Sequence, residues 1–143
     1  MGEAARLVAA ERTDTVYRVG ALRDRLEEGL LSLVPGVRRT VPDGTPRTPG
    51  VAHLCVDGIE SEELLFLLER EGVAASAASS CASGAQEPSH VLAAMGVDRV
   101  TAGGSLRLSL GHASTDAEVA HVLAVLPPAV ERLRGYARSL QSG

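Results

Sequence analysis

The sequence predicts an α+β fold in which a small β-sheet is covered by helices, in a single domain that spans residues 1–143. Long stretches near both ends have apolar residues at helical spacing, whereas the stretches typical of strands are few and short. Such a chain favours a sheet that is covered on one face by helices. Apolar residues make up 45% of the sequence and charged residues 22%, which favours a soluble packed domain over a disordered chain.

A long helix should form the beginning of the domain. Residues 3–33 are rich in Ala, Leu, Arg and Glu, with a stripe of leucines at helical spacing. Pro35 and Gly36 end this helix, and residues 37–50 have the composition of an exposed loop with one short strand. The predicted stripe consists of Leu22, Leu26, Leu30 and Leu33.

A buried strand and a second helix are predicted next. Residues 51–56 are apolar enough for a buried strand. Ser61 is expected to cap the following helix, which ends at Gly72, and residues 73–76 are expected to form a short strand. The buried side of this helix should consist of Leu64, Leu65, Leu67 and Leu68.

A loop and a short helix follow. Residues 77–86 are a run of Ala, Ser, Gly and Gln with one Cys, and the run has neither periodicity nor bulk, which is typical of a loop. Pro88 is well placed at the start of a short helix that Gly96 closes. One side of this helix should consist of Val91, Leu92 and Met95.

The last predicted elements are a strand and a helix. Residues 105–110 alternate leucine with polar residues, so this strand has an apolar face and a polar face that carries Arg107. Thr115 and Glu118 form a capping box that opens the final helix. The two prolines at 127–128 are expected to kink or restart that helix.

The charge pattern argues against two classes of partner. The net charge is −4 and the pI is near 5.5, without a cluster of like charges, so neither nucleic acid nor an anionic membrane surface is an expected partner. The sequence shows neither a leader nor an apolar run long enough to span a membrane, so we expect a cytoplasmic protein.

The two cysteines lie in different settings. Cys55, between Leu54 and Val56 on a predicted strand, fits a structural role as a small buried hydrophobe. Cys81 lies in the small-residue loop without apolar neighbours, which favours an accessible thiol whose role composition alone leaves open between reactive and inert. We expect no metal site, because no tight cluster with the cysteines is formed by His53, His90, His112 and His121.

Two motifs resemble those of the NifS/IscS-type cysteine desulfurases, which belong to the class V aminotransferase family. The first is S-S-C-A-S-G-A-Q-E-P-S-H-V-L-A-A-M-G at 79–96, which resembles the active-site loop of that family. The second is S-L-R-L-S-L-G at 105–111, which is similar to a strand motif of the family. The resemblance covers nearly the whole chain and implies the C-terminal small domain of a fold-type I pyridoxal 5'-phosphate (PLP) enzyme. Ala78 and Ser79 depart from it, since the family usually has a glycine there.

The resemblance also implies roles for two residues. Cys81 would be the catalytic nucleophile that takes sulfur from cofactor-bound L-cysteine, giving alanine and a persulfide for iron–sulfur cluster assembly or thiolation. Arg107 would bind the carboxylate of the substrate, because a planar guanidinium on a rigid strand grips a carboxylate with two hydrogen bonds. On spacing alone, Arg107 is more often a solvated or salt-bridged strand residue.

The implied cofactor has no binding residue in this chain. All fourteen basic residues are arginines, and PLP is held as a Schiff base by a lysine. The resemblance therefore implies a large domain, absent from this chain, that supplies both PLP and the lysine, and it implies that the chain alone is inactive. The expected partners are L-cysteine, this large domain or a full-length desulfurase, a sulfur-acceptor protein and, as is typical of the family, a second copy in a homodimer.

Two alternatives stay open at this point. The lack of lysine also fits a stand-alone persulfide carrier, or an interaction module that pairs with a full-length desulfurase. An inactive remnant is the other alternative, because an aromatic content of 2% predicts a modest core.

Overall fold

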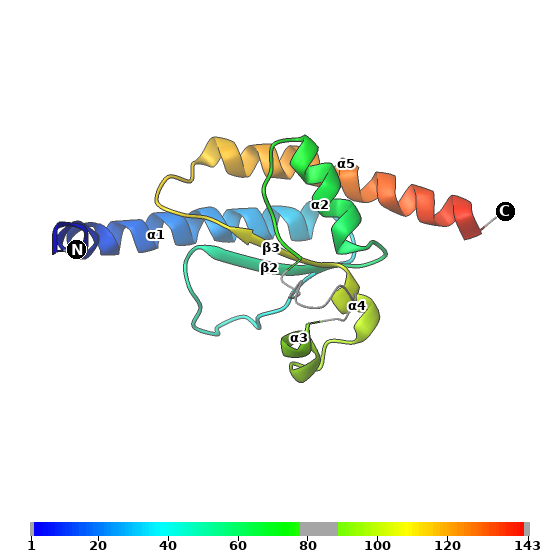
Figure 1. Cartoon of the computed structure of the whole chain (residues 1–143), viewed down its shortest axis with the longest axis horizontal. Coiled ribbons are helices and arrows are strands. Elements are labelled where there is room, and N and C mark those ends of the chain that lie inside the picture. The colour runs from blue at the N-terminus through cyan, green and yellow to red at the C-terminus, as the bar shows by residue number, and fades with distance from the viewer. Residues whose placement is uncertain (1, 78–88, 142–143) are drawn as a thin grey trace.

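Figure 1 shows the computed structural model, which describes residues 2–77 and 89–141. Long helices lie near both ends of the chain, with short strands between them, so the predicted α+β class is confirmed. The described elements are α1 (Gly2–Leu33), β1 (Val37–Arg39), β2 (Val51–Val56), α2 (Ser61–Arg70), α3 (His90–Ala94), α4 (Arg99–Gly103), β3 (Ser105–Ser109) and α5 (Asp116–Gln141).

The strands form one antiparallel sheet in the order β1-β2-β3. In the register of β2 and β3, His53 lies opposite Arg107 and Leu54 lies opposite Leu106. At the other edge of β3, the strand predicted at 73–76 is reduced to a single bridge between Ser76 and Arg107. Paired residues point to the same face of a sheet, so this register assigns each side chain of β2 and β3 to one of two faces.

One face of the sheet is apolar and is covered by α1, α2 and α5, which lie on the same side of the sheet in Figure 1. β2 and β3 place alternate side chains on this face because the side chains of a strand have a period of two. These side chains are Ala52, Leu54, Val56, Leu106 and Leu108, all buried. They belong to the main core together with Leu22, Leu26 and Leu30 of α1, Leu64 and Leu68 of α2, and Leu126 and Val130 of α5.

The opposite face is polar, and the described residues cover it only in part. The short helices α3 and α4 lie on this side, and a small second core forms from Cys55, Leu92 and Ala102. The helix α4 is not among the predicted elements. It begins after Asp98, and the side chain of Asp98 accepts a hydrogen bond from the Thr101 backbone amide at 3.0 Å.

Most of the predicted helix ends are confirmed. The capping box of α5 has both of its reciprocal bonds, from the Thr115 amide to Glu118 at 2.8 Å and from the Glu118 amide to the Thr115 hydroxyl at 3.3 Å. Gly72 follows α2 with a φ of +76°, as a residue in this left-handed position should. The prolines at 127–128 do not restart the last helix, since α5 continues through them to Gln141.

Four side chains differ from the prediction. Ser61 is the first residue of α2 rather than its cap, and its hydroxyl lies 2.6 Å from the carbonyl oxygens of both Gly103 and Ser105. Leu33 is exposed because the inward positions of α1 continue at a spacing of four to Val34. Leu92 is the buried residue of α3 because it packs with Cys55 and Ala102, whereas Val91 and the following Met95 are exposed.

A buried ion cluster attaches the loop after β1 to α1. The Glu27 side chain is 0% exposed, and its carboxylate accepts hydrogen bonds from Arg47 at 2.7 and 2.8 Å and from Arg39 at 3.1 Å. A carboxylate buried beneath a helix is tolerated when it is paired and fully hydrogen-bonded. This cluster connects Arg39 at the end of β1 and Arg47 of the following loop to α1.

Candidate functional site

Arg107 lies on the polar face, in the middle of β3. Its backbone amide donates to the Ser76 carbonyl at 2.7 Å, and its carbonyl accepts from the Ser76 amide at 3.1 Å. β2 pairs with the other edge of the strand and places His53 directly opposite. With both edges of the backbone paired, the base of the Arg107 side chain is fixed while the side chain itself is exposed.

The guanidinium of Arg107 is available to bind an anion. Within residues 2–77 and 89–141 it forms no ion pair and no hydrogen bond. Several other arginines are engaged, as Arg39 and Arg47 are with Glu27, and as Arg134 is with the Asp57 carbonyl at 2.6 and 2.9 Å. A rigidly based guanidinium without an internal carboxylate partner suits the binding of a carboxylate ligand.

His53 is the neighbour of Arg107 across the sheet. It is half-buried, and its Nδ1 lies 2.8 Å from the hydroxyl oxygen of Thr40. Burial, and secondarily the positive charge of Arg107, lower the pKa of His53 below its ordinary value. The imidazole beside Arg107 is therefore neutral at neutral pH.

Ser76 and Ala77 are anchored along β3. The hydroxyl of buried Ser105 donates to the Ala77 carbonyl, and Ser61 in turn contacts the Ser105 carbonyl. These bonds hold the chain against the strand that carries Arg107, at the first residue of the predicted loop. Cys81, the predicted nucleophile, lies in that loop and outside the described residues.

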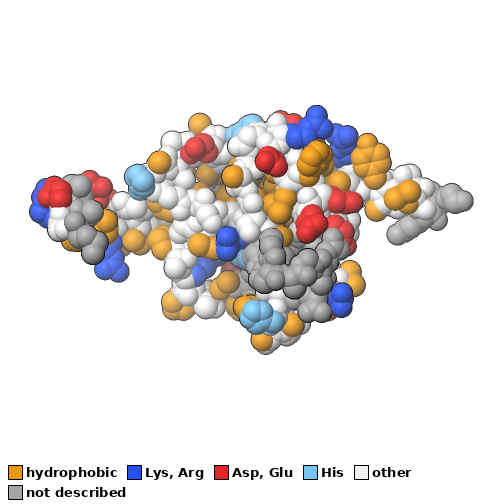
Figure 2. Space-filling model, viewed as in Figure 1, with side chains coloured by type: hydrophobic (Ala, Val, Ile, Leu, Met, Phe, Trp, Pro, Cys, Tyr) orange, Lys and Arg blue, Asp and Glu red, His pale blue; other side chains and the backbone are white. Residues whose placement is uncertain are grey.

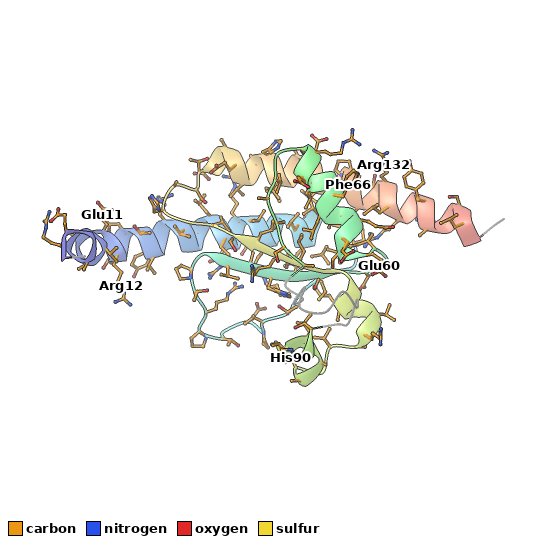
Figure 3. All side chains as sticks on the ribbon, viewed as in Figure 1. Glu11, Arg12, Glu60, Phe66, His90 and Arg132 are labelled. Carbon is orange, nitrogen blue, oxygen red and sulfur yellow. The ribbon has the colours of Figure 1, made fainter. Side chains whose placement is uncertain are left out.

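The other predicted residues have ordinary surroundings. Cys55 is 1% exposed in an apolar cluster, which confirms its structural role, and burial raises the pKa of its thiol. His90 is an exposed residue at the start of α3 (Figure 3). Among the described residues, no three His, Cys, Asp or Glu side chains are placed to hold a metal ion.

Two residues near Arg107 were not predicted: His53, which lies opposite it, and Thr40, which contacts His53. A signal was present, because His53 alternates with the apolar residues of its strand and so belongs to the polar face. Its neighbour on that face depends on strand register, which the alternation does not give. The contact with Thr40 depends on the pairing of β1 and β2 as well.

A separate pocket of about 410 Å³ opens on the apolar side, between the edge of β3 and the first turns of α5. Its wall includes Val73, Leu108, Leu110 and Val119, and Arg107 is not part of it. Figure 2 shows acidic and basic side chains interspersed over the visible face of the molecule. In the described chain, no helix has both the length and the apolar character needed to cross a membrane.

The residues of this chain do not fit PLP by themselves. The cofactor needs an amine for its Schiff base, and the sequence contains no lysine. The described polar face carries the exposed guanidinium of Arg107, but it does not offer an attachment for PLP.

Comparison with known proteins gives a consistent family. The sequence model of the family described as "Aminotransferase class-V" matches residues 1–122. An IscS-like cysteine desulfurase of Mycobacterium tuberculosis is 45% identical over 134 residues, which are 94% of this chain and 34% of that protein. A cysteine desulfurase of Klebsiella pneumoniae is 43% identical over 125 residues, 87% of this chain and 31% of that protein.

The fold is also similar to solved structures. The crystal structure of a NifS-like protein from Rickettsia africae matches 91% of this chain and 33% of its own chain, with a TM-score of 0.77 and 22% identity. At this identity the match shows the fold alone. The chain spans about a third of the length of the curated relatives that it matches. The predicted resemblance to NifS/IscS-type proteins is confirmed.

Proposed function

The chain belongs to the class-V aminotransferase family, and we propose that it is the small C-terminal domain of a cysteine desulfurase. The enzyme would remove sulfur from L-cysteine and give alanine and a persulfide for iron–sulfur cluster assembly or thiolation. The single observation that carries the proposal is the exposed guanidinium of Arg107, which has no partner among the described residues. Its backbone is paired with Ser76, shortly before Cys81 in the sequence. The similarity to proteins named cysteine desulfurase supports the same reaction.

Arg107 is proposed to bind the carboxylate of the substrate. A bidentate pair with the guanidinium would hold the carboxylate and fix the direction in which the rest of the amino acid extends. The absence of an acidic partner among the described residues leaves the guanidinium available.

Cys81 is proposed to receive the sulfur atom. Its thiolate would form a sulfur–sulfur bond with the substrate while the carbon–sulfur bond of the substrate breaks. The electron pair of the broken bond stays with the substrate carbon, which takes up protons and leaves as alanine. Cys55 is an unsuitable acceptor, because it is buried and the pKa of its thiol is raised.

A large domain is proposed to complete the enzyme. It would supply PLP and the lysine that this chain lacks, so the chain by itself would be inactive. A sulfur-acceptor protein and a second copy of the enzyme are the further partners that we propose. A cytoplasmic location stays a prediction.

The lack of lysine favours one other candidate function, a carrier that accepts persulfide sulfur from a separate full-length desulfurase. Such a carrier would need an accessible Cys81 but not the carboxylate site. The Arg107 guanidinium, which has no partner in the part of the chain that the structure describes, supports the desulfurase over the carrier.

Mass spectrometry of Cys81 tests these proposals. The chain is incubated with L-cysteine and PLP, with or without a lysine-bearing large domain, and the peptide containing Cys81 is examined for an added mass of about 32 Da, one sulfur atom. We expect the adduct only with the large domain present, and we expect Cys81→Ser to abolish it. Cys55→Ala is the matched control and should leave the adduct in place.

Each other result has a definite meaning. An adduct that requires an intact desulfurase, and that survives Arg107→Ala, would favour the carrier. No adduct under any of these conditions would mean that the chain keeps the family fold as an inactive remnant.

A further inference from the structure

His53 lies directly opposite Arg107 in the pairing of β2 and β3. On the polar face, the described residues directly opposite Arg107 on the neighbouring segments are His53 and Ser76. Within β3, the nearest residues on the same face are Ser105 and Ser109, two positions before and after Arg107. Of these residues, His53 is the one with a large planar side chain. An arginine side chain rotates about several bonds and loses entropy when it is ordered, so a planar neighbour at a fixed place limits its conformations.

The ring of His53 is itself held in place. Its Nδ1 lies 2.8 Å from the Thr40 hydroxyl, and its carbonyl accepts a hydrogen bond from the Thr40 amide at 3.3 Å. Thr40 follows Arg39, whose guanidinium donates to the buried Glu27 carboxylate at 3.1 Å. A continuous set of contacts therefore runs from α1 through Thr40 to the residue opposite Arg107.

The charge state of His53 suits this position. A protonated imidazole would repel the guanidinium opposite it, whereas a neutral imidazole allows the two planar groups to approach each other. The other charged groups near Thr40 pair among themselves, with Glu27 between Arg39 and Arg47 and with Asp43 on Arg39. They leave Arg107 as the charged group that faces His53 across the strand pair.

We propose that His53 is a positioning residue for the carboxylate site. Held by Thr40, its neutral ring orients the guanidinium of Arg107 so that the carboxylate of the substrate binds in one direction. The inference rests on the proposed function, because it assumes that Arg107 binds the carboxylate of L-cysteine. It adds a residue that does not touch the reacting atoms and acts through Arg107.

The test uses the complete enzyme, in which this chain is joined to its PLP-binding domain. His53→Ala should raise KM for L-cysteine about threefold to tenfold, the cost of ordering a free arginine side chain, with a smaller change in kcat. His53→Phe keeps a neutral planar ring and should restore most of the KM. Thr40→Val keeps the size of residue 40 but removes the hydroxyl, and should raise KM by a smaller factor than His53→Ala.

Two further readouts separate positioning from a general structural role. In an Arg107→Ala background, His53→Ala should have no additional effect on KM, because the residue acts through the missing guanidinium. The KM of the wild-type enzyme should rise as the pH falls and His53 becomes protonated, and this rise should be absent from His53→Phe.

The outcomes separate a failure of the positioning role of His53 from a failure of the proposed carboxylate site at Arg107. If Arg107→Ala leaves KM unchanged, the carboxylate site is wrong and the role of His53 fails with it. If Arg107→Ala raises KM but His53→Ala and Thr40→Val do not, only the positioning role is overturned. The same holds if the effects of His53→Ala and Arg107→Ala are additive.

Discussion

The two faces of one small sheet differ in almost every property. On one face, Leu54 and Leu106 are 0–1% exposed beneath long helices. On the other face, His53 is half-buried and Arg107 is exposed, although both belong to the same strands and lie directly opposite each other. The packed apolar face therefore holds the polar face in place, because a shift of β2 or β3 would move the side chains of both faces together.

The largest effect on stability should come from the apolar face. Leu54→Ala removes a fully buried side chain from the centre of the core, and it should lower the free energy of unfolding by about 2 to 5 kcal/mol. Denaturant unfolding monitored by circular dichroism measures this loss. A loss under about 1 kcal/mol would show that this face is not the stable base of the sheet.

A second effect on stability should come from the buried ion cluster that connects Arg39 and Arg47 to α1. Glu27→Gln keeps the shape of the side chain but removes the charge that pairs with Arg39 and Arg47, so it should cost about 1.5 to 3 kcal/mol. Glu28→Gln, at the next position and exposed, is the matched control and should change stability by less than about 0.5 kcal/mol. Equal effects of the two variants would contradict the role of the cluster.

A smaller, pH-dependent effect should come from His53. Its folded-state pKa is lowered by burial and by Arg107, so the unfolded chain binds a proton more readily than the folded chain does. The free energy of unfolding is therefore not reduced by His53 above the pKa of this residue in the unfolded chain, about 6.5. It falls as the pH drops from there toward the lower pKa of His53 in the folded chain. Unfolding measured at several pH values should show this loss in the wild type and not in His53→Phe.

Arg107 should contribute least to stability. Its side chain is exposed and lacks a partner among the described residues, so Arg107→Ala should change the free energy of unfolding by less than about 0.5 kcal/mol. The same variant should strongly weaken the use of L-cysteine by the complete enzyme. A variant that loses stability and activity together would show that the two faces are not separate in function.

Much of this contrast could be predicted from the sequence. The alternation in residues 105–110 placed Arg107 on a polar face, and the composition of residues 51–56 predicted β2 with the observed bounds. The helix α4 was missed because five residues give too little periodicity, although Asp98 and Thr101 carry a capping signal. Local sequence predicts Ser61 as a helix cap. Its hydroxyl instead contacts the carbonyls of Gly103 and Ser105, which are far away in the sequence.

By itself the sequence determined the local features: the period of each strand and helix, the capping box of α5, and the absence of lysine. Only the tertiary structure decided that His53 lies opposite Arg107, that Thr40 holds its ring, and that Glu27 pairs with Arg39 and Arg47. The physical reason is distance along the chain. Periodicity and capping arise from neighbouring residues, whereas strand register and the pairing of buried charges depend on which distant segments pack together.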